Sequence, residues 1–143
     1  MTAGAGFFIS WPALNARVAA RLLDDFNPHG CREFVKTLPV KSVQSHSVVA
    51  GNQIYCPFRL NVDRALLRNE LMSGQGIGRV NIELDFQYLS INYGPITEAV
   101  PAVPLAQVEE SHIPVLLSVG GEIWRNLNTV HEKKFIVVEF TRV

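Results

Sequence analysis

The chain has 143 residues, enough for one domain (residues 1–143) that buries about two-thirds of its unfolded surface. Its 13 basic and 13 acidic residues balance, so no net charge attracts nucleic acid or an anionic membrane, and we expect neither as a partner. The hydrophobic share of 48% is high for a monomer and favours a homo-oligomer, although a wide apolar pocket would also explain it.

Neither a signal peptide nor a membrane span is visible in the sequence. No segment approaches the roughly 20 apolar residues that a transmembrane helix needs. Cys31 and Cys56 lack the spacing of a redox or metal-binding pair, and two free thiols are typical of a cytoplasmic protein. We therefore expect a soluble, cytoplasmic protein.

The first third of the chain predicts two strands and a helix. Residues 6–11 are typical of a short buried strand, and residues 16–24 alternate between apolar and polar side chains as a half-buried strand does. Asn27 suits the N-cap of a helix and Pro28 its first position. We expect this helix to end at Pro39.

Strand patterns dominate the middle of the chain. Residues 44–58 predict two strands around a tight turn at Gly51-Asn52, a dipeptide suited to positive φ. Residues 61–72 fit either one short helix or an irregular excursion. The apolar alternation that begins at Val80 changes phase near Asp85–Tyr88, which indicates a bulge or a turn there.

The last third predicts a second helix and a closing strand. The helix begins near Ser111, and Gly120-Gly121 in its middle indicate either close approach of another backbone or a break. Residues 134–142 form the closing strand, and Trp11 and Trp124 are expected in the core. The helix stripe comprises Ile113, Leu116, Leu117, Trp124 and Leu127. The order of elements predicts a mainly antiparallel sheet or barrel covered by two helices.

The order of several short motifs resembles a group of small prokaryotic cyclophilin-like proteins. The segment from Arg21 to Phe58 contains, in order, Asp24-Asp25, Asn27-Pro28, Cys31, Leu38-Pro39, Ser45-His46, and Gly51 with Tyr55. The segment SINYGPITEAVPAVPLAQV, residues 90–108, is similar to the same group. It is also similar to the cyclophilin-like domain of the cucumopine and mikimopine type opine synthases. The resemblance covers roughly residues 7–110.

This resemblance implies a mainly β fold, a closed eight-stranded cyclophilin-like barrel capped by two helices. The opine synthases condense the amine of histidine with the keto group of 2-oxoglutarate and close a ring in a Pictet–Spengler type cyclisation. The resemblance to these synthases therefore implies an enzyme for small molecules, which uses general acid–base catalysis and needs neither a metal nor another cofactor. Prolyl isomerase activity is not expected, because cyclophilins carry Arg where Ser47 follows His46.

A non-catalytic module that binds a small metabolite or a peptide is the alternative function. The opine synthases usually carry an additional C-terminal helical domain, which these 143 residues do not contain. No local pattern supports a phosphate loop, because the glycines of SGQGIGR precede a strand rather than open a helix. The four histidines lack the spacing of metal-ligand pairs.

Three residues are candidates for catalysis. Glu98 lies in an apolar, proline-rich segment and is the candidate base, although it also fits an ordinary surface loop. His46 is the candidate acid–base partner, and a structural histidine that hydrogen-bonds across the barrel is the other interpretation. Tyr93 offers a phenol, or simply packs in the wall.

Five more residues are candidates for substrate binding: Arg59, Tyr55, Asn92, Thr97 and Gln107. Arg59 would pair with a substrate carboxylate if it is not a solvated surface residue. The two amide side chains can orient a carboxylate or satisfy neighbouring backbone groups. Because prolines restrict the backbone, we expect Asn92–Gln107 to form one lip of a pocket. Residues His46, Tyr55 and Arg59 would form the opposite wall.

Overall fold

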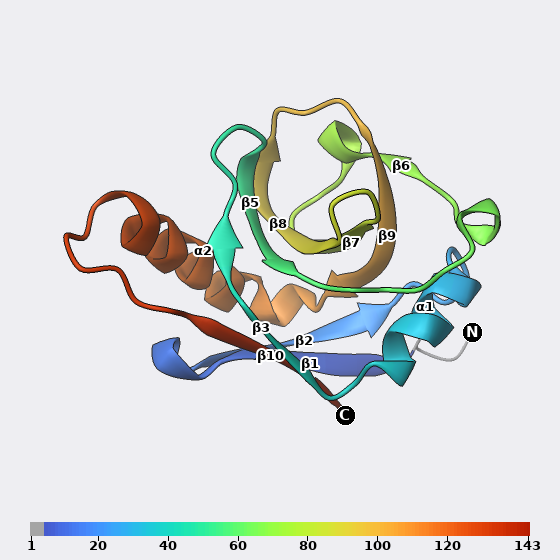
Figure 1. The fold of residues 1–143 in the computed structure, drawn as a ribbon, viewed down its shortest axis with the longest axis horizontal. Helices are drawn as coiled ribbons and strands as arrows, with labels where there is room; N and C mark the ends of the chain where they lie inside the picture. The colour runs from blue at the N-terminus through green and yellow to red at the C-terminus, as the bar shows by residue number, and fades with distance from the viewer. Residues whose placement is uncertain (1–4) are drawn as a thin grey trace.

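The computed structural model describes residues 5–143, which contain ten strands and two α-helices (Figure 1). The helices are α1 (Pro28–Lys36) and α2 (Ile113–Asn128). The strands are β1 (Gly6–Trp11), β2 (Ala16–Leu22), β3 (Val40–Val43), β4 (Ser45–His46), β5 (Gly51–Pro57), β6 (Glu70–Leu71), β7 (Arg79–Glu83), β8 (Tyr88–Ile96), β9 (Pro101–Val108) and β10 (Val137–Arg142). All the strand pairs between them are antiparallel.

The main sheet is a nearly closed barrel. Its strand order is β3-β10-β1-β2-β9-β7-β8-β5-β4, and β6 pairs with β9 outside this path. The two ends of the path, β3 and β4, are separated in the chain only by Gln44. They therefore act as one interrupted strand, which gives the eight-stranded barrel that the resemblance implies. The side chain of Gln44 fastens this point by accepting from Trp11 Nε1 at 2.8 Å and donating to the Tyr55 carbonyl at 2.8 Å.

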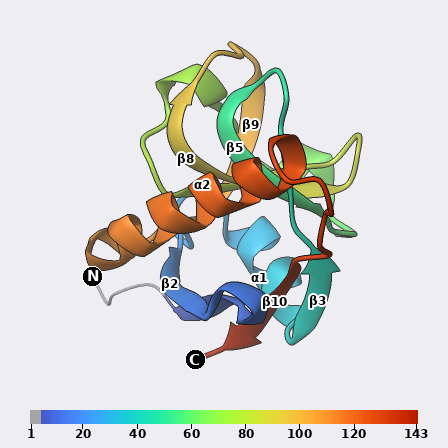
Figure 2. The same cartoon turned by 90° about the vertical axis from the view of Figure 1, so that its left-hand side faces the viewer.

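One helix packs at each end of the barrel (Figure 2). Phe34 of α1 lies in an aromatic cluster, with its ring centroid 4.8 Å from that of Phe7 and 5.5 Å from that of Phe58. Helix α2 crosses between the two halves of the barrel and buries Leu116, Val119, Gly120 and Ile123. Within residues 5–143, no helix has the length and apolar character that crossing a membrane requires.

Most of the expected elements are confirmed, with one change at each helix. Helix α1 begins at Pro28, but the Asn27 side chain makes no capping bond. It is fully buried and instead donates to the carbonyls of Arg68 and Pro104. Helix α2 is continuous through its glycines. The prediction that Trp124 packs in the core is wrong, because its side chain is 41% exposed on α2.

The turn predicted at Gly51-Asn52 is wrong in position. Gly51 has the expected positive φ of 110° but begins β5, and the chain turns at Ser47–Ala50. A Cβ on Gly51 would lie 2.5 Å from the Pro95 carbonyl oxygen, so close contact with β8 explains this glycine. The phase change near Asp85 is a turn between β7 and β8. Residues 61–72 form an excursion that contains one short 3-10 helix (Arg64–Leu66) and strand β6, and a second 3-10 helix (Met72–Gly74) follows.

Candidate functional site

A cavity of about 310 Å³ opens on the face of β5, β7 and β8 that is turned away from the barrel core. Side chains alternate along a strand, so Ile54 and Leu89 point into the core while Tyr55 and Ser90, paired across β5 and β8, line the cavity. The Ser47–Ala50 loop, Met72 and the loop between β8 and β9 complete the walls.

The loop between β8 and β9 contributes Glu98 to the cavity wall and is held on both sides of that residue. The backbone N–H of Thr97 donates to the Ala50 carbonyl at 2.9 Å, and its hydroxyl donates to the Val49 carbonyl at 3.0 Å. On the other side, Met72 N–H donates to the Val100 carbonyl at 2.8 Å. Glu98 is half-buried, and no ion pair involves it within residues 5–143. The loop backbone at Glu98 is therefore fixed on both sides, and no cation of residues 5–143 neutralises its carboxylate.

A second carboxylate and an aromatic wall lie across the cavity from this loop. Glu83 is at the end of β7, opposite Tyr88 in the register, and its Oε1 accepts from the Asp85 N–H at 2.7 Å. The Tyr88 ring lies 4.6 Å from that of Tyr55 and 5.8 Å from that of Phe86, centroid to centroid. No Lys or Arg of residues 5–143 lines the cavity. It is therefore a negatively charged, aromatic site.

His46 lies at the back of the cavity with both ring nitrogens engaged. Its Nδ1 is 2.6 Å from the Ser47 carbonyl oxygen, which can only accept, so we assign the ring proton to Nδ1. Its Nε2 then accepts from the Tyr93 hydroxyl at 2.5 Å. Burial lowers the pKa of His46 and raises the pKa of Tyr93, which favours the neutral form of each. The pair holds the Ser47–Ala50 loop against the barrel.

Helix α2 packs against this pair of side chains. The Trp124 ring lies 4.6 Å from the His46 ring in an edge arrangement. A Cβ on Gly120 would lie 2.6 Å from carbons of the Tyr93 ring, whereas one on Gly121 would meet nothing within 4 Å. Gly120 therefore provides the close approach that its sequence position indicated, with a side chain rather than a backbone as the neighbour.

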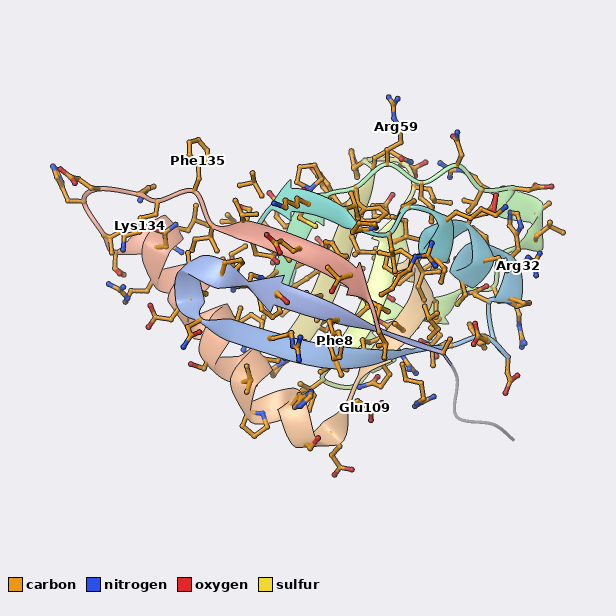
Figure 3. The ribbon with its side chains drawn as sticks, turned by 90° about the horizontal axis from the view of Figure 1, so that it is seen from below. Phe8, Arg32, Arg59, Glu109, Lys134 and Phe135 are labelled. Carbon is orange, nitrogen blue, oxygen red and sulfur yellow. The ribbon has the colours of Figure 1, made fainter. Side chains whose placement is uncertain are left out.

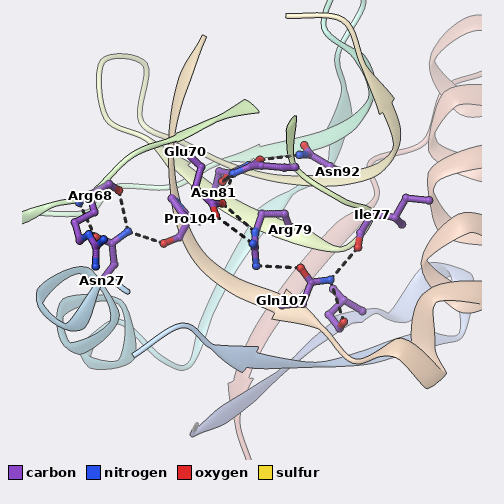
Figure 4. A network of polar contacts seen from close by, with 11 residues as sticks. Asn27, Arg68, Glu70, Ile77, Arg79, Asn81, Asn92, Pro104 and Gln107 are labelled. Carbon is purple, nitrogen blue, oxygen red and sulfur yellow. Dashed lines mark hydrogen bonds and ion pairs between the residues drawn. The ribbon is translucent and has the colours of Figure 1, made fainter. Parts of the chain in front are cut away.

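Next to the cavity, a cluster of amide side chains is joined by hydrogen bonds (Figure 4). Gln53 Nε2 donates to Asn92 Oδ1 at 3.1 Å, and Asn92 Nδ2 donates to Gln75 Oε1 at 2.9 Å. Gln75 and Asn81 exchange two hydrogen bonds of 2.8 Å. Because Gln53 also lines the cavity, this network fixes part of its floor.

The same network continues to an ion pair. Arg79 Nε lies 3.0 Å from Glu70 Oε1, and Arg79 Nη2 donates to Glu70 Oε2 at 3.2 Å. Arg79 Nη1 donates to Gln107 Oε1 at 3.2 Å, and Gln107 Nε2 donates to the Ile77 carbonyl at 2.8 Å. The guanidinium of Arg79 is therefore directed at protein partners, as Figure 4 shows.

The structure brings some of the eight sequence candidates together and separates others. His46, Tyr55 and Glu98 line one cavity. Tyr93 and Asn92 each lie one hydrogen bond behind it, through His46 and Gln53, and Thr97 anchors the loop that bears Glu98.

Arg59 and Gln107 do not reach the cavity. Arg59 points away from the body of the protein (Figure 3) and lines a separate groove with Lys41 and Ser42. Gln107 is held by Arg79. The expected wall of His46, Tyr55 and Arg59 therefore forms without its cation, because Arg59 follows the end of β5 and turns outward.

Sequence reasoning missed Glu83, Phe86, Tyr88 and Ser90. The sequence does contain a pattern that points to this face: polar residues occupy alternate positions of the neighbouring strands β7 and β8. Asn81 pairs with Ser90 and Glu83 with Tyr88 in the register of β7 and β8, so these polar positions share one face. Within either strand alone, such polar positions look the same as those of a strand face that is exposed to solvent.

No protein-family model matches the sequence, and no curated protein sequence matches it. Solved structures do match. McbB, determined in complex with tryptophan, superimposes with a TM-score of 0.80 and 28% identity over 95% of this chain and 44% of the McbB chain. The chain thus spans less than half the length of McbB.

Two more distant structures share the fold. A hypothetical protein from Archaeoglobus fulgidus matches with a TM-score of 0.57 and 13% identity, over 99% of this chain and 96% of that one. The Mimivirus cyclophilin matches with a TM-score of 0.53 and 13% identity, over 96% and 87% of the two chains. The expected barrel is confirmed: the chain has a cyclophilin-like fold and is similar to McbB in fold and, at 28% identity, in sequence.

Proposed function

We propose that the protein is a condensing enzyme that joins an amino compound to an oxo compound and closes a ring by a Pictet–Spengler type reaction. The observation that carries the proposal is the cavity itself, which Glu83, Glu98 and several aromatic rings line, with no Lys or Arg of residues 5–143 to neutralise the two carboxylates. McbB, the relative that matches 95% of the chain, was determined with tryptophan bound. Tryptophan, like histidine, combines a primary amine with a nucleophilic ring carbon, the two groups that this reaction uses.

The reaction needs only proton transfers. The amine loses a proton and forms a C–N bond to the carbonyl carbon, and the oxygen leaves as water after protonation. The resulting iminium carbon is attacked by the ring carbon, a C–C bond forms, and the ring carbon releases its proton. One water is lost in total and nothing is oxidised or reduced.

Glu98 suits the base in this sequence. Its carboxylate can accept the proton of the ammonium group, return it to the departing hydroxyl, and then accept the proton of the ring carbon. Hydrogen bonds at Thr97 and Met72 hold its loop in place, so little reorganisation accompanies each transfer. Glu83 and the faces of Tyr55 and Tyr88 stabilise the positive charge of the iminium ion.

In this proposal His46 and Tyr93 do not exchange protons with the substrate and act only by positioning other groups. Both nitrogens of His46 are engaged, one by the Ser47 carbonyl and the other by the Tyr93 hydroxyl. We therefore assign the pair the task of positioning the Ser47–Ala50 loop, in place of the direct proton transfer expected from the sequence. Asn92 likewise acts through Gln53.

Mass spectrometry of a substrate panel tests the proposal. The amines are histidine, histamine, tryptophan and tryptamine, each incubated with 2-oxoglutarate, which the resemblance to opine synthases implies, or with a small aldehyde. The expected product has the mass of both reactants less one water. Borohydride quenching separates the outcomes, because an open imine gains two hydrogens and a cyclised product gains none.

Two variants complete the test. Glu98→Gln should slow formation of the cyclised product about 10²- to 10⁴-fold, because glutamine cannot accept the protons. Glu109→Gln, at an exposed carboxylate outside the cavity, should leave it unchanged. If the protein binds the amines but gives no cyclised product with any pair of amine and carbonyl compound, the alternative of a non-catalytic binding module holds instead.

A further inference from the structure

We propose that the cavity selects its amino compound as a cation without a carboxylate, an arylalkylamine in preference to an aromatic α-amino acid. The inference rests on the proposed function for its chemistry and deepens it by naming the substrate class. Its test uses binding alone, so that its outcome is independent of turnover.

The charges around the cavity carry the inference. Glu83 and Glu98 line it, and no Lys or Arg of residues 5–143 does. The sequence candidate for binding a carboxylate, Arg59, points outward. The guanidinium of the adjoining network belongs to Arg79, and Glu70 neutralises it at 3.0 Å.

An α-amino acid would bring its own carboxylate into this setting. That carboxylate would lose water and approach two like charges without a basic side chain to compensate, which opposes binding. An amine without a carboxylate would be attracted to the two glutamates through its ammonium group and would carry no negative charge for them to repel. The cavity therefore distinguishes the two ligands by charge and not by the shape of the ring.

The aromatic wall supports the same ligand class. Tyr55, Tyr88 and Phe86 form a continuous series of rings, with neighbouring centroids 4.6 and 5.8 Å apart. Such rings bind a flat aromatic group by stacking and an adjacent cation through their faces. Val48 and Val49, each 76% exposed at the rim, would be covered by the bound ring. The volume of about 310 Å³ suits one bicyclic amine with a small carbonyl compound.

Three ligands that share the indole ring and differ in charge test the inference. Tryptamine carries one positive charge, tryptophan is a zwitterion, and indole-3-propionate carries one negative charge. Isothermal titration of the full chain, without a carbonyl compound, should rank them in that order. We expect tryptamine to bind at least about tenfold more tightly than tryptophan, as for the loss of one charged interaction, and indole-3-propionate to bind weakest.

Variants assign the ranking to the two carboxylates. Glu83→Gln and Glu98→Gln should each weaken tryptamine binding about tenfold, and the double variant should bind tryptamine and tryptophan alike. Glu109→Gln should retain the wild-type ranking. Circular dichroism checks that each variant is folded, and the wild-type ranking stands as a test even if a variant is not.

Two results would overturn the inference: wild-type protein that binds tryptophan as tightly as tryptamine, and wild-type protein that binds no tryptamine at millimolar concentration. The two proposals fail separately. Absence of a cyclised product would remove the condensing function and leave the ranking intact. Product formation from tryptophan but not tryptamine would remove only this inference.

Discussion

Two groups of polar side chains lie next to each other on the outer face of the β5-β8-β7-β9 sheet, and they differ in pairing. In the first, Arg79 lies between Glu70 and Gln107, and amide side chains bond to one another beside it. In the second, Glu83 and Glu98 face a cavity that no Lys or Arg of residues 5–143 lines.

The difference separates polar groups that stabilise the fold from those available to a ligand. A buried polar group costs free energy unless it is hydrogen-bonded, and a buried charge costs more unless it is paired. The first group meets most of this requirement through its own contacts. Arg79 Nε, which is buried and has no hydrogen-bond partner within residues 5–143, lies 3.0 Å from the Glu70 carboxylate as an ion pair. The carboxylates of the second group remain half-buried beside the cavity. A cationic ligand in the cavity would therefore supply the ion pair that they lack.

The largest expected effect contrasts one glutamate from each group. Glu98→Gln should lower kcat by about 10²- to 10⁴-fold, the usual contribution of a general base, while the free energy of unfolding changes by less than about 0.5 kcal/mol. Glu70→Gln should do the reverse, with lower stability and near-normal kcat. Steady-state kinetics measure kcat, and urea unfolding measures the free energy of unfolding. The comparison breaks if Glu98→Gln instead unfolds the protein without slowing the reaction.

Arg79→Met tests the paired group alone. The side chains of Arg79 and Glu70 are only 22% and 28% exposed, so the variant leaves a largely buried carboxylate without its cation. We expect a loss of about 2 kcal/mol in the free energy of unfolding, less than for a fully buried pair because both groups retain some solvent. The double variant with Glu70→Gln should recover part of this loss. Equal stability of the single variant and wild type in urea would contradict the assigned pairing.

Adjacent glycines of α2 provide a matched test of how closely Tyr93 packs against this helix. Gly120→Ala should destabilise the protein by about 1 to 2 kcal/mol, because its Cβ would lie 2.6 Å from the Tyr93 ring. Gly121→Ala meets nothing within 4 Å and should stabilise the helix by up to about 1 kcal/mol. Thermal unfolding of the two variants shows whether their effects have opposite signs, and effects of the same sign would argue against close packing of Tyr93 on α2.

The smallest effect is a pH dependence of stability. Burial holds the pKa of His46 below its usual value of 6.5, so the unfolded chain takes up this proton at a higher pH than the folded protein does. The free energy of unfolding should therefore decrease as the pH falls below about 6.5 towards the folded pKa, and this contribution should be constant above that range.

The His46→Gln variant isolates this contribution. Urea unfolding at pH 7.5 and 5.5 should show a smaller decrease in the variant than in wild type, because the other titrating groups cancel in the difference. An identical pH dependence in both proteins would mean that His46 does not titrate differently on folding.

Several parts of the fold followed from local patterns. Alternating apolar residues predicted β1 and β2, Pro28 marked the first residue of α1, and the apolar stripe predicted α2. Local patterns failed where a distant segment imposed the conformation. Gly51 suggested a turn, yet its positive φ accompanies close contact with Pro95 in β8.

The candidate site was predicted only in part for a similar reason. The proline-rich segment did direct attention to Glu98, which lies in the cavity with His46 and Tyr55. Arg59 and Arg79 are equivalent in the sequence as basic residues next to strands. Only side-chain direction and neighbours show that the first points to solvent and the second is paired with Glu70.

The sequence by itself determined the succession of strands and helices, because periodicity and helix-start signals act over a few neighbouring residues, and its resemblance to cyclophilin-like proteins implied the closed barrel. The tertiary structure decided which charges are paired, since Glu70 and Arg79 meet across an excursion, while Glu83 at the end of β7 and Glu98 in the loop between β8 and β9 line one cavity. Charge pairing depends on distances of a few ångströms between residues far apart in the chain, and no local pattern encodes those distances.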